Sequence, residues 1–170
     1  MRHAFIGLCL FTAACSGQPL SPTSPSGVAG LGAQTQASGG APIEVTFTKW
    51  STGAAIGTGI PTHTGVAGRD VPGTFAGTVL TRDVFDNGTI NQLEALYEVA
   101  ADDPAHSFVA HIEGKQNNET QEAVFNGTII EGWLLGAQVH VTYDRIAPCP
   151  AFGQAVCFTG VIRVMPGSAD

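Results

Sequence analysis

The segment Phe75–Ala101 reads FAGTVLTRDVFDNGTINQLEALYEVAA, and it contains the clearest turn signal in the chain. At its centre, Asn87-Gly88 lies within the run Asp86–Thr89, between two longer and more apolar stretches. Asn and Gly accept the positive φ angles of a tight hairpin turn more readily than other residues do. We therefore predict a β-hairpin whose strands lie within Phe75–Phe85 and Ile90–Ala101.

The second strand of this hairpin has an alternative interpretation as a helix. A helix over Asn91–Ala101 would gather four apolar residues on one face, namely Leu93, Leu96, Tyr97 and Ala100. Asn91 and Glu94 would then form a pair similar to a capping box. A strand would instead place every second residue from Leu93 onward on one face. We favour the strand, because the Asn-Gly turn just before it needs a partner strand.

A period of two continues outside the hairpin. Apolar residues alternate with more polar ones in three further runs, Ile43–Phe47, Phe108–Ile112 and Val139–Tyr143. Near the end of the chain, Val156, Phe158, Ile162 and Val164 share one phase. Strands with one apolar and one wetter face are typical of antiparallel sheets. Asp102–Pro104 and Lys115–Asn118 are rich in turn-forming residues and would close two further connections.

The sequence therefore predicts an all-β domain at residues 42–167. Only 12% of the residues in the chain are charged and 22 are Gly, a composition that suits a loop-rich β protein better than a helical one. We expect an antiparallel β-barrel or β-sandwich of about six to eight strands. The least regular part, Trp50–Gly73, is either a plain long connection with room for one short strand, or a loop over a barrel mouth that carries binding residues.

Two cysteines, Cys149 and Cys157, flank a short loop just before the last predicted strand. In an oxidising compartment such a pair should form a disulfide. The loop-entropy model assigns about 2.6 kcal/mol to the closure of so short a loop. We interpret the pair as a structural crosslink rather than a redox centre, because no Cys-x-x-Cys is present.

The N-terminus has the features of an export signal. Arg2 supplies a positive charge, Ala4–Ala14 is a mainly apolar run, and Ala13-Ala14 are the small residues that signal peptidases need. Eleven helical residues would cover about 16 Å, too little to cross a hydrocarbon core about 30 Å thick. We therefore predict a signal peptide at residues 1–14 that directs the chain out of the cytoplasm.

The residues at the end of this signal, Thr12-Ala13-Ala14-Cys15, resemble the lipobox of bacterial lipoproteins, although Thr12 stands where that family usually has Leu. The resemblance implies that Cys15 becomes the lipidated first residue and holds the protein on a membrane of the bacterial cell envelope. The alternative is ordinary secretion, which would leave a soluble secreted or periplasmic protein. Residues 15–41, with no charged side chain, predict a flexible linker between the anchor and the domain.

Charge excludes one class of partner. The chain has 7 Lys and Arg against 14 Asp and Glu, and loss of Arg2 with the signal peptide makes the balance more acidic still. Such a chain repels phosphate backbones, so we expect no nucleic-acid binding.

Signals for catalysis and metal binding are weak. The sequence contains no Gly-x-Ser-x-Gly, His-Glu-x-x-His, P-loop or Gly-x-Gly-x-x-Gly motif. His111 and Glu113 would share a strand face that His140 could approach, and such a set can bind zinc. All three alternate with apolar residues, so solvated outer side chains are the simpler interpretation. We expect no catalytic residue, metal or cofactor.

The pattern favours a non-catalytic binding module for a small apolar ligand or an envelope protein. Small eight-stranded barrels have room inside for side chains or for one small ligand. The alternatives are a structural or protein-interaction domain with a filled core and, third, a barrel enzyme.

Overall fold

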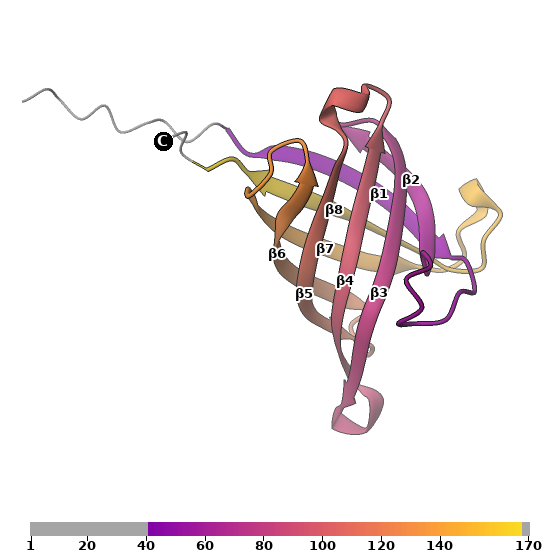
Figure 1. Cartoon of the computed structure of the whole chain (residues 1–170). Coiled ribbons are helices and arrows are strands. Elements are labelled where there is room, and N and C mark those ends of the chain that lie inside the picture. The colour runs from indigo at the N-terminus through magenta and orange to yellow at the C-terminus, as the bar shows by residue number, and fades with distance from the viewer. Residues whose placement is uncertain (1–40, 168–170) are drawn as a thin grey trace, which may run out of the picture. The chain divides into compact units, whose positions relative to one another are not determined.

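The computed structural model describes residues 41–167, and this part of the chain forms a closed antiparallel barrel of eight strands (Figure 1). The strands are β1 (Ile43–Ser51), β2 (His63–Arg69), β3 (Gly73–Phe85), β4 (Ile90–Ala101), β5 (Phe108–Asn117), β6 (Glu122–Gly132), β7 (Gln138–Ile146) and β8 (Cys157–Met165). The all-β prediction is confirmed, and the architecture is the barrel rather than the sandwich.

Every strand pairs with its neighbour in the chain, and β8 returns to pair with β1. Gly160 of β8 lies opposite Phe47 of β1 in this closing ladder. Closure leaves no edge strand in the barrel, although β3 extends beyond Gly77, where its pairing with β2 ends. Because successive strands alternate in direction, the β1–β2, β3–β4, β5–β6 and β7–β8 connections share one end, which we call the hairpin end.

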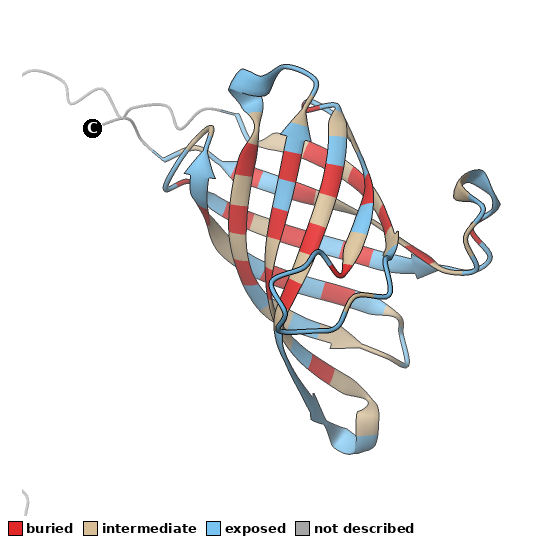
Figure 2. Cartoon of the chain, turned by 45° about the vertical axis from the view of Figure 1, so that its right-hand side comes forward, coloured by how far each residue is buried: buried red, intermediate tan, exposed pale blue. Residues whose placement is uncertain are grey.

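Buried residues alternate with more exposed ones over much of the barrel wall, as the bands of Figure 2 show, because successive side chains of a strand point to opposite faces. The predicted apolar phases point inward: Val45 and Phe47, then Phe108, Ala110 and Ile112, then Val139, Val141 and Tyr143 are all buried. Away from the hairpin end, the interior is filled by packed side chains, among them Val99, Ile129 and Val164.

The hairpin predicted from Asn87-Gly88 is present. It joins β3 and β4, the two longest strands, and projects beyond the rest of the barrel (Figure 1). The turn is a short 3-10 helix, η1 (Asp86–Gly88), with positive φ angles of 53° at Asn87 and 99° at Gly88. Asn91–Ala101 is extended throughout, so the strand interpretation is confirmed and the helical alternative is wrong.

Two other turn predictions have different outcomes. Asp102–Pro104 does lie in the β4–β5 connection, which includes the 3-10 helix η2 (Pro104–His106). The predicted turn at Lys115–Asn118 begins too early, because β5 continues through Asn117, where it still pairs with Ile90. The length of β4 explains the difference, because its first residues, Ile90–Gln92, pair with Lys115–Asn117 and so extend β5.

Cys149 and Cys157 lie at disulfide-bonding distance, with Cα atoms 5.8 Å apart, as their spacing predicted. They enclose the 3-10 helix η3 (Pro150–Phe152) and fix the β7–β8 connection at the start of β8. Cys15, the predicted signal peptide and the predicted linker up to residue 40 lie outside the described residues. None of the helices within 41–167 has the length and apolar character that a membrane-spanning helix needs.

Candidate functional site

A cavity of about 210 Å³ lies inside the barrel toward the hairpin end. All eight strands and the loop between β1 and β2 contribute to its wall. The wall consists of Lys49, Ile56, His63, Val79, Arg82, Asn91, Leu93, Ala95, Tyr97, Gln116, Phe125, Tyr143 and Phe158. Most of these side chains are apolar or aromatic, and a few polar groups are placed among them. That combination is typical of small-molecule sites.

Lys49 is the most unusual residue of this wall. It continues the inward phase of Val45 and Phe47 along β1, and only 2% of its surface is exposed. Its ammonium nitrogen Nζ forms a hydrogen bond with the Tyr97 hydroxyl. Lysine is among the residues least often found fully buried in proteins, so its position here calls for a functional explanation.

Five aromatic rings surround the Lys49 amine. The distances from Nζ to the ring centroids are 4.1 Å for Tyr143, 4.4 Å for Tyr97, 5.7 Å for Phe47, 5.8 Å for Phe158 and 5.9 Å for Phe75. Rings at these distances attract a cation through their π faces. They replace part of the hydration that a charged amine loses on burial, and three of them, Tyr97, Tyr143 and Phe158, also line the cavity.

Burial dominates the electrostatics of the site. It lowers the pKa of Lys49 from 10.5 to about 7. Burial, and then the charge of Lys49, lowers the pKa of His63 to about 3, so this imidazole is neutral at physiological pH. Burial also raises the pKa of Tyr97 and of Tyr143, and both hydroxyls therefore keep their protons.

Two amide side chains complete the polar part of the wall. The Tyr143 hydroxyl donates to Gln116 Oε1 at 3.0 Å, and Asn91 Nδ2 donates to Asn118 Oδ1 at 3.1 Å. The other amide atom of Asn91, Oδ1, is buried and has no hydrogen-bond partner among the described residues. A buried acceptor without a donor is costly, so a ligand or water that donates to it would be stabilised.

The loop between β1 and β2 covers part of the cavity. Ile56 from this loop is in the cavity wall. The loop is tied to β3 beyond the point where β2 pairing ends at His63–Gly77: the Gly57 N–H donates to the Val79 carbonyl at 3.1 Å, and the Thr62 hydroxyl accepts from the Val79 N–H at 3.1 Å. Of the two interpretations of Trp50–Gly73, the structure contains the short strand β2 and also places one loop residue, Ile56, at the cavity.

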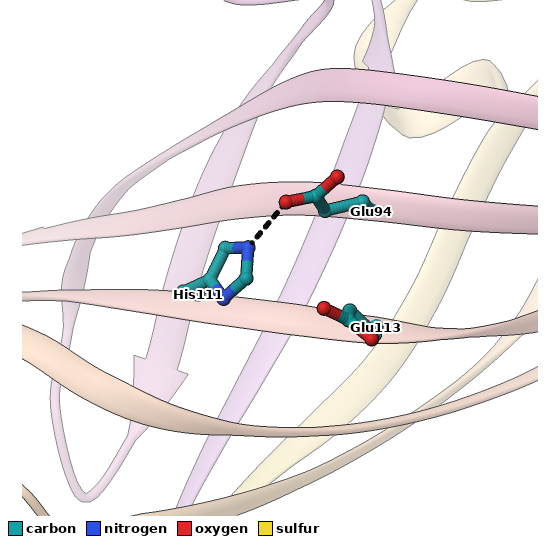
Figure 3. Close-up of side chains that lie close together, drawn as sticks. All are labelled: Glu94, His111 and Glu113. Atoms are coloured by element: carbon teal, nitrogen blue, oxygen red, sulfur yellow. Dashed lines mark hydrogen bonds and ion pairs between the residues drawn. The ribbon is translucent and has the colours of Figure 1, made fainter.

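The histidines considered for zinc, His111 and His140, are not in the cavity wall, and each alternates with buried residues of its strand. Figure 3 shows His111 beside Glu94 and Glu113. Glu94 of β4 joins His111 and Glu113 of β5, with ligand atoms within 4.8 Å of one another, whereas His140 is outside this group and lies 2.9 Å from Asn126 Oδ1. His111 Nε2 and Glu94 Oε1 are 2.8 Å apart, and this hydrogen bond lowers the pKa of the Glu94 carboxyl. The arrangement is a hydrogen-bonded His–Glu pair on the barrel wall with a second carboxylate beside it.

The sequence identified none of the cavity residues as a site residue, Lys49, Tyr97 and Tyr143 included. A signal for Lys49 was present, because it stands two residues after Phe47 in the same phase as Ile43 and Val45. Residues of one phase in a strand point to one face of the sheet. A charged residue that continues an apolar phase is therefore a candidate interior group.

The chain matches no known protein family, no curated protein and no solved structure. The side chains of the cavity are therefore the basis for a functional proposal.

Proposed function

We propose that the barrel is a non-catalytic binding module that holds one small, mainly apolar ligand in the cavity beside Lys49. The observation that carries the proposal is a cavity of about 210 Å³ whose wall combines aromatic rings with a buried amine. A core designed only for stability would fill such a space with apolar side chains.

The polar groups indicate what such a ligand should carry. Lys49, His63, Arg82, Asn91 and Gln116 lie in the wall, and within the described part of the chain no Asp or Glu does. A ligand with an apolar body and one oxygen acceptor directed at Lys49 would complement this wall. The free Asn91 Oδ1 would favour a ligand that also brings a donor, or a water that bridges to it.

Two substitutions on β4 test the location of the site. Ala95 is in the cavity wall and Ala100 is exposed on the same strand. Ala95→Leu should fill part of the cavity and abolish binding, whereas Ala100→Leu should leave it intact. The measurement is native mass spectrometry of the gently purified full chain, with benzyl alcohol as the probe. Equal adduct formation by both variants would place the ligand outside the barrel.

We further propose that the domain is tethered in the bacterial cell envelope through a lipid on Cys15. The lipobox-like Thr12–Cys15 and the uncharged linker that follows support this proposal. The Cys149–Cys157 pair is compatible with export, since disulfides persist in oxidising compartments.

Cys15→Ser should release the protein from membranes into the soluble fraction. Fractionation of cells that express the wild-type and variant chains, with mass analysis of the N-terminal peptide, measures this directly. A wild-type protein that is soluble and carries no lipid would support ordinary secretion instead.

A further inference from the structure

We propose that Lys49 is a covalent capture site, whose amine condenses with the carbonyl group of a small aldehyde to form an imine inside the barrel. This inference rests on the proposed function, because it assigns the chemistry by which the same cavity retains its ligand. The ligand class is an aldehyde with an apolar or aromatic body.

The surroundings of the amine favour a nucleophile over a counter-ion. Lys49 Nζ lies in the cavity wall and bonds to the Tyr97 hydroxyl, and no carboxylate of the described residues shares that wall. Desolvation without an acidic partner favours the neutral amine, the form with a free electron pair. The lowered pKa of Lys49, about 7, agrees with this geometry.

The step balances with groups that are present. The nitrogen electron pair of Lys49 attacks the carbonyl carbon, a C–N bond forms, and the carbonyl π pair moves onto oxygen. The Tyr97 hydroxyl can give a proton to that oxygen and take one from the nitrogen, which yields a neutral carbinolamine. Loss of the carbinolamine hydroxyl with a proton releases one water and leaves the imine. No oxidant or reductant is required.

The aromatic wall suits the product as well. Protonation of the imine would place a cation at the position of the former amine, where the ring centroids of Tyr143 and Tyr97 lie 4.1 and 4.4 Å from Nζ. Their π faces attract a cation, and their surfaces pack against a flat apolar ligand.

The sequence makes the test unusually clear, since Lys49 and Lys115 are its only lysines. Lys115 is exposed on β5, so it serves as an internal reference within the same molecule. The folded full chain is incubated with benzaldehyde and cyanoborohydride, which converts an imine into a stable benzylamine. Peptide mass mapping then locates the benzyl group.

We expect benzylation of Lys49 to exceed that of Lys115 by at least about tenfold. Lys115→Met should keep the labelling, and Lys49→Met, which preserves an unbranched side chain, should lose it. Ala95→Leu retains Lys49 but narrows the cavity, and it should also protect the amine. Circular dichroism confirms that each variant is folded.

Labelling confined to Lys115 or the α-amino group would overturn the inference. The fate of the proposed function is read separately, from native mass spectra with benzyl alcohol, which has no carbonyl. If benzyl alcohol binds but Lys49 is not labelled, only the covalent step fails. If benzoate binds and benzaldehyde does not react, the cavity is an anion site and the imine is excluded. If neither binding nor labelling occurs, both proposals fail.

Discussion

At the scale of single residues, Lys49 is a buried basic group inside a mainly apolar barrel. Its amine is buried among aromatic rings and forms a hydrogen bond with the Tyr97 hydroxyl. An apolar side chain of similar length would cost less to bury, because it has no charge to desolvate. The site therefore retains a group that opposes stability, which is common where a residue serves a function.

This arrangement predicts that stability depends on pH. Between about pH 7 and 10 the unfolded chain binds a proton that folded Lys49 has lost, so the free energy of unfolding should rise with pH. Above that window Tyr97 and Tyr143 act in the opposite direction, since their raised pKa values leave only the unfolded tyrosines ionised. Between about pH 6.5 and pH 3, only the unfolded form of His63 binds a proton, so the free energy of unfolding should fall as the pH is lowered through this range.

Urea unfolding across pH 7 to 10 measures the effect of Lys49. Wild type should gain stability through this range, and Lys49→Met should largely lose the gain. Lys115→Met is the matched control, since that lysine is exposed. An unchanged slope in Lys49→Met would show that another group causes it.

Gly160 predicts a second effect at this scale. A Cβ at this position would collide with the Thr142 carbonyl and would lie 2.9 Å from the Phe47 ring. Gly160→Ala should therefore lower the free energy of unfolding by about 1–3 kcal/mol through overpacking. Gly167→Ala is the control, because no atom lies within 4 Å of its added Cβ. Denaturant titration compares the two, and equal stabilities would contradict the close approach.

At the scale of elements, the β1–β2 loop contributes Ile56 to the cavity wall and contacts β3 beyond the point where β2 stops pairing with it. The Thr62 hydroxyl donates to the Gly77 carbonyl at 3.0 Å and accepts from the Val79 N–H at 3.1 Å. Both contacts continue the ladder that β2 would otherwise supply. Ile56 is thereby kept at the cavity wall.

Thr62→Val should remove both contacts while it preserves shape. We expect a loss of about 1–3 kcal/mol, since the Val79 N–H and the Gly77 carbonyl lose a buried partner. Hydrogen exchange of the Gly57 amide should also accelerate, because the loop separates from β3. Thr64→Val, on the exposed face of β2, is the control. Unchanged Gly57 exchange would show that the loop is held by other contacts.

The sequence predicts elements better than it predicts the site, for a physical reason. Alternation along β5 and β7, and the Asn-Gly turn, are local properties, and they place the strands correctly. Lys49 shares the same alternation, but a charged residue is normally assigned to solvent. The pairing of Glu94 with His111 depends on the register between β4 and β5, which local patterns do not define.

At the scale of the whole molecule, the barrel has two unequal halves. One end is filled with packed side chains, and the hairpin end contains the cavity. The alternative of an entirely filled core therefore does not describe both ends. Packed side chains at one end and a lined space at the other are compatible with the binding function proposed above.

The most direct test of the account is a heteronuclear NMR titration of the isotopically labelled full chain with benzyl alcohol. We predict saturable chemical-shift changes that are largest at cavity residues such as Lys49, Tyr97 and Phe158. The exposed outer residues Val124 and Ile130 should be unaffected. Chemical-shift changes confined to that outer face would contradict a binding site inside the barrel. The absence of any change at the highest concentration of benzyl alcohol would contradict it as well.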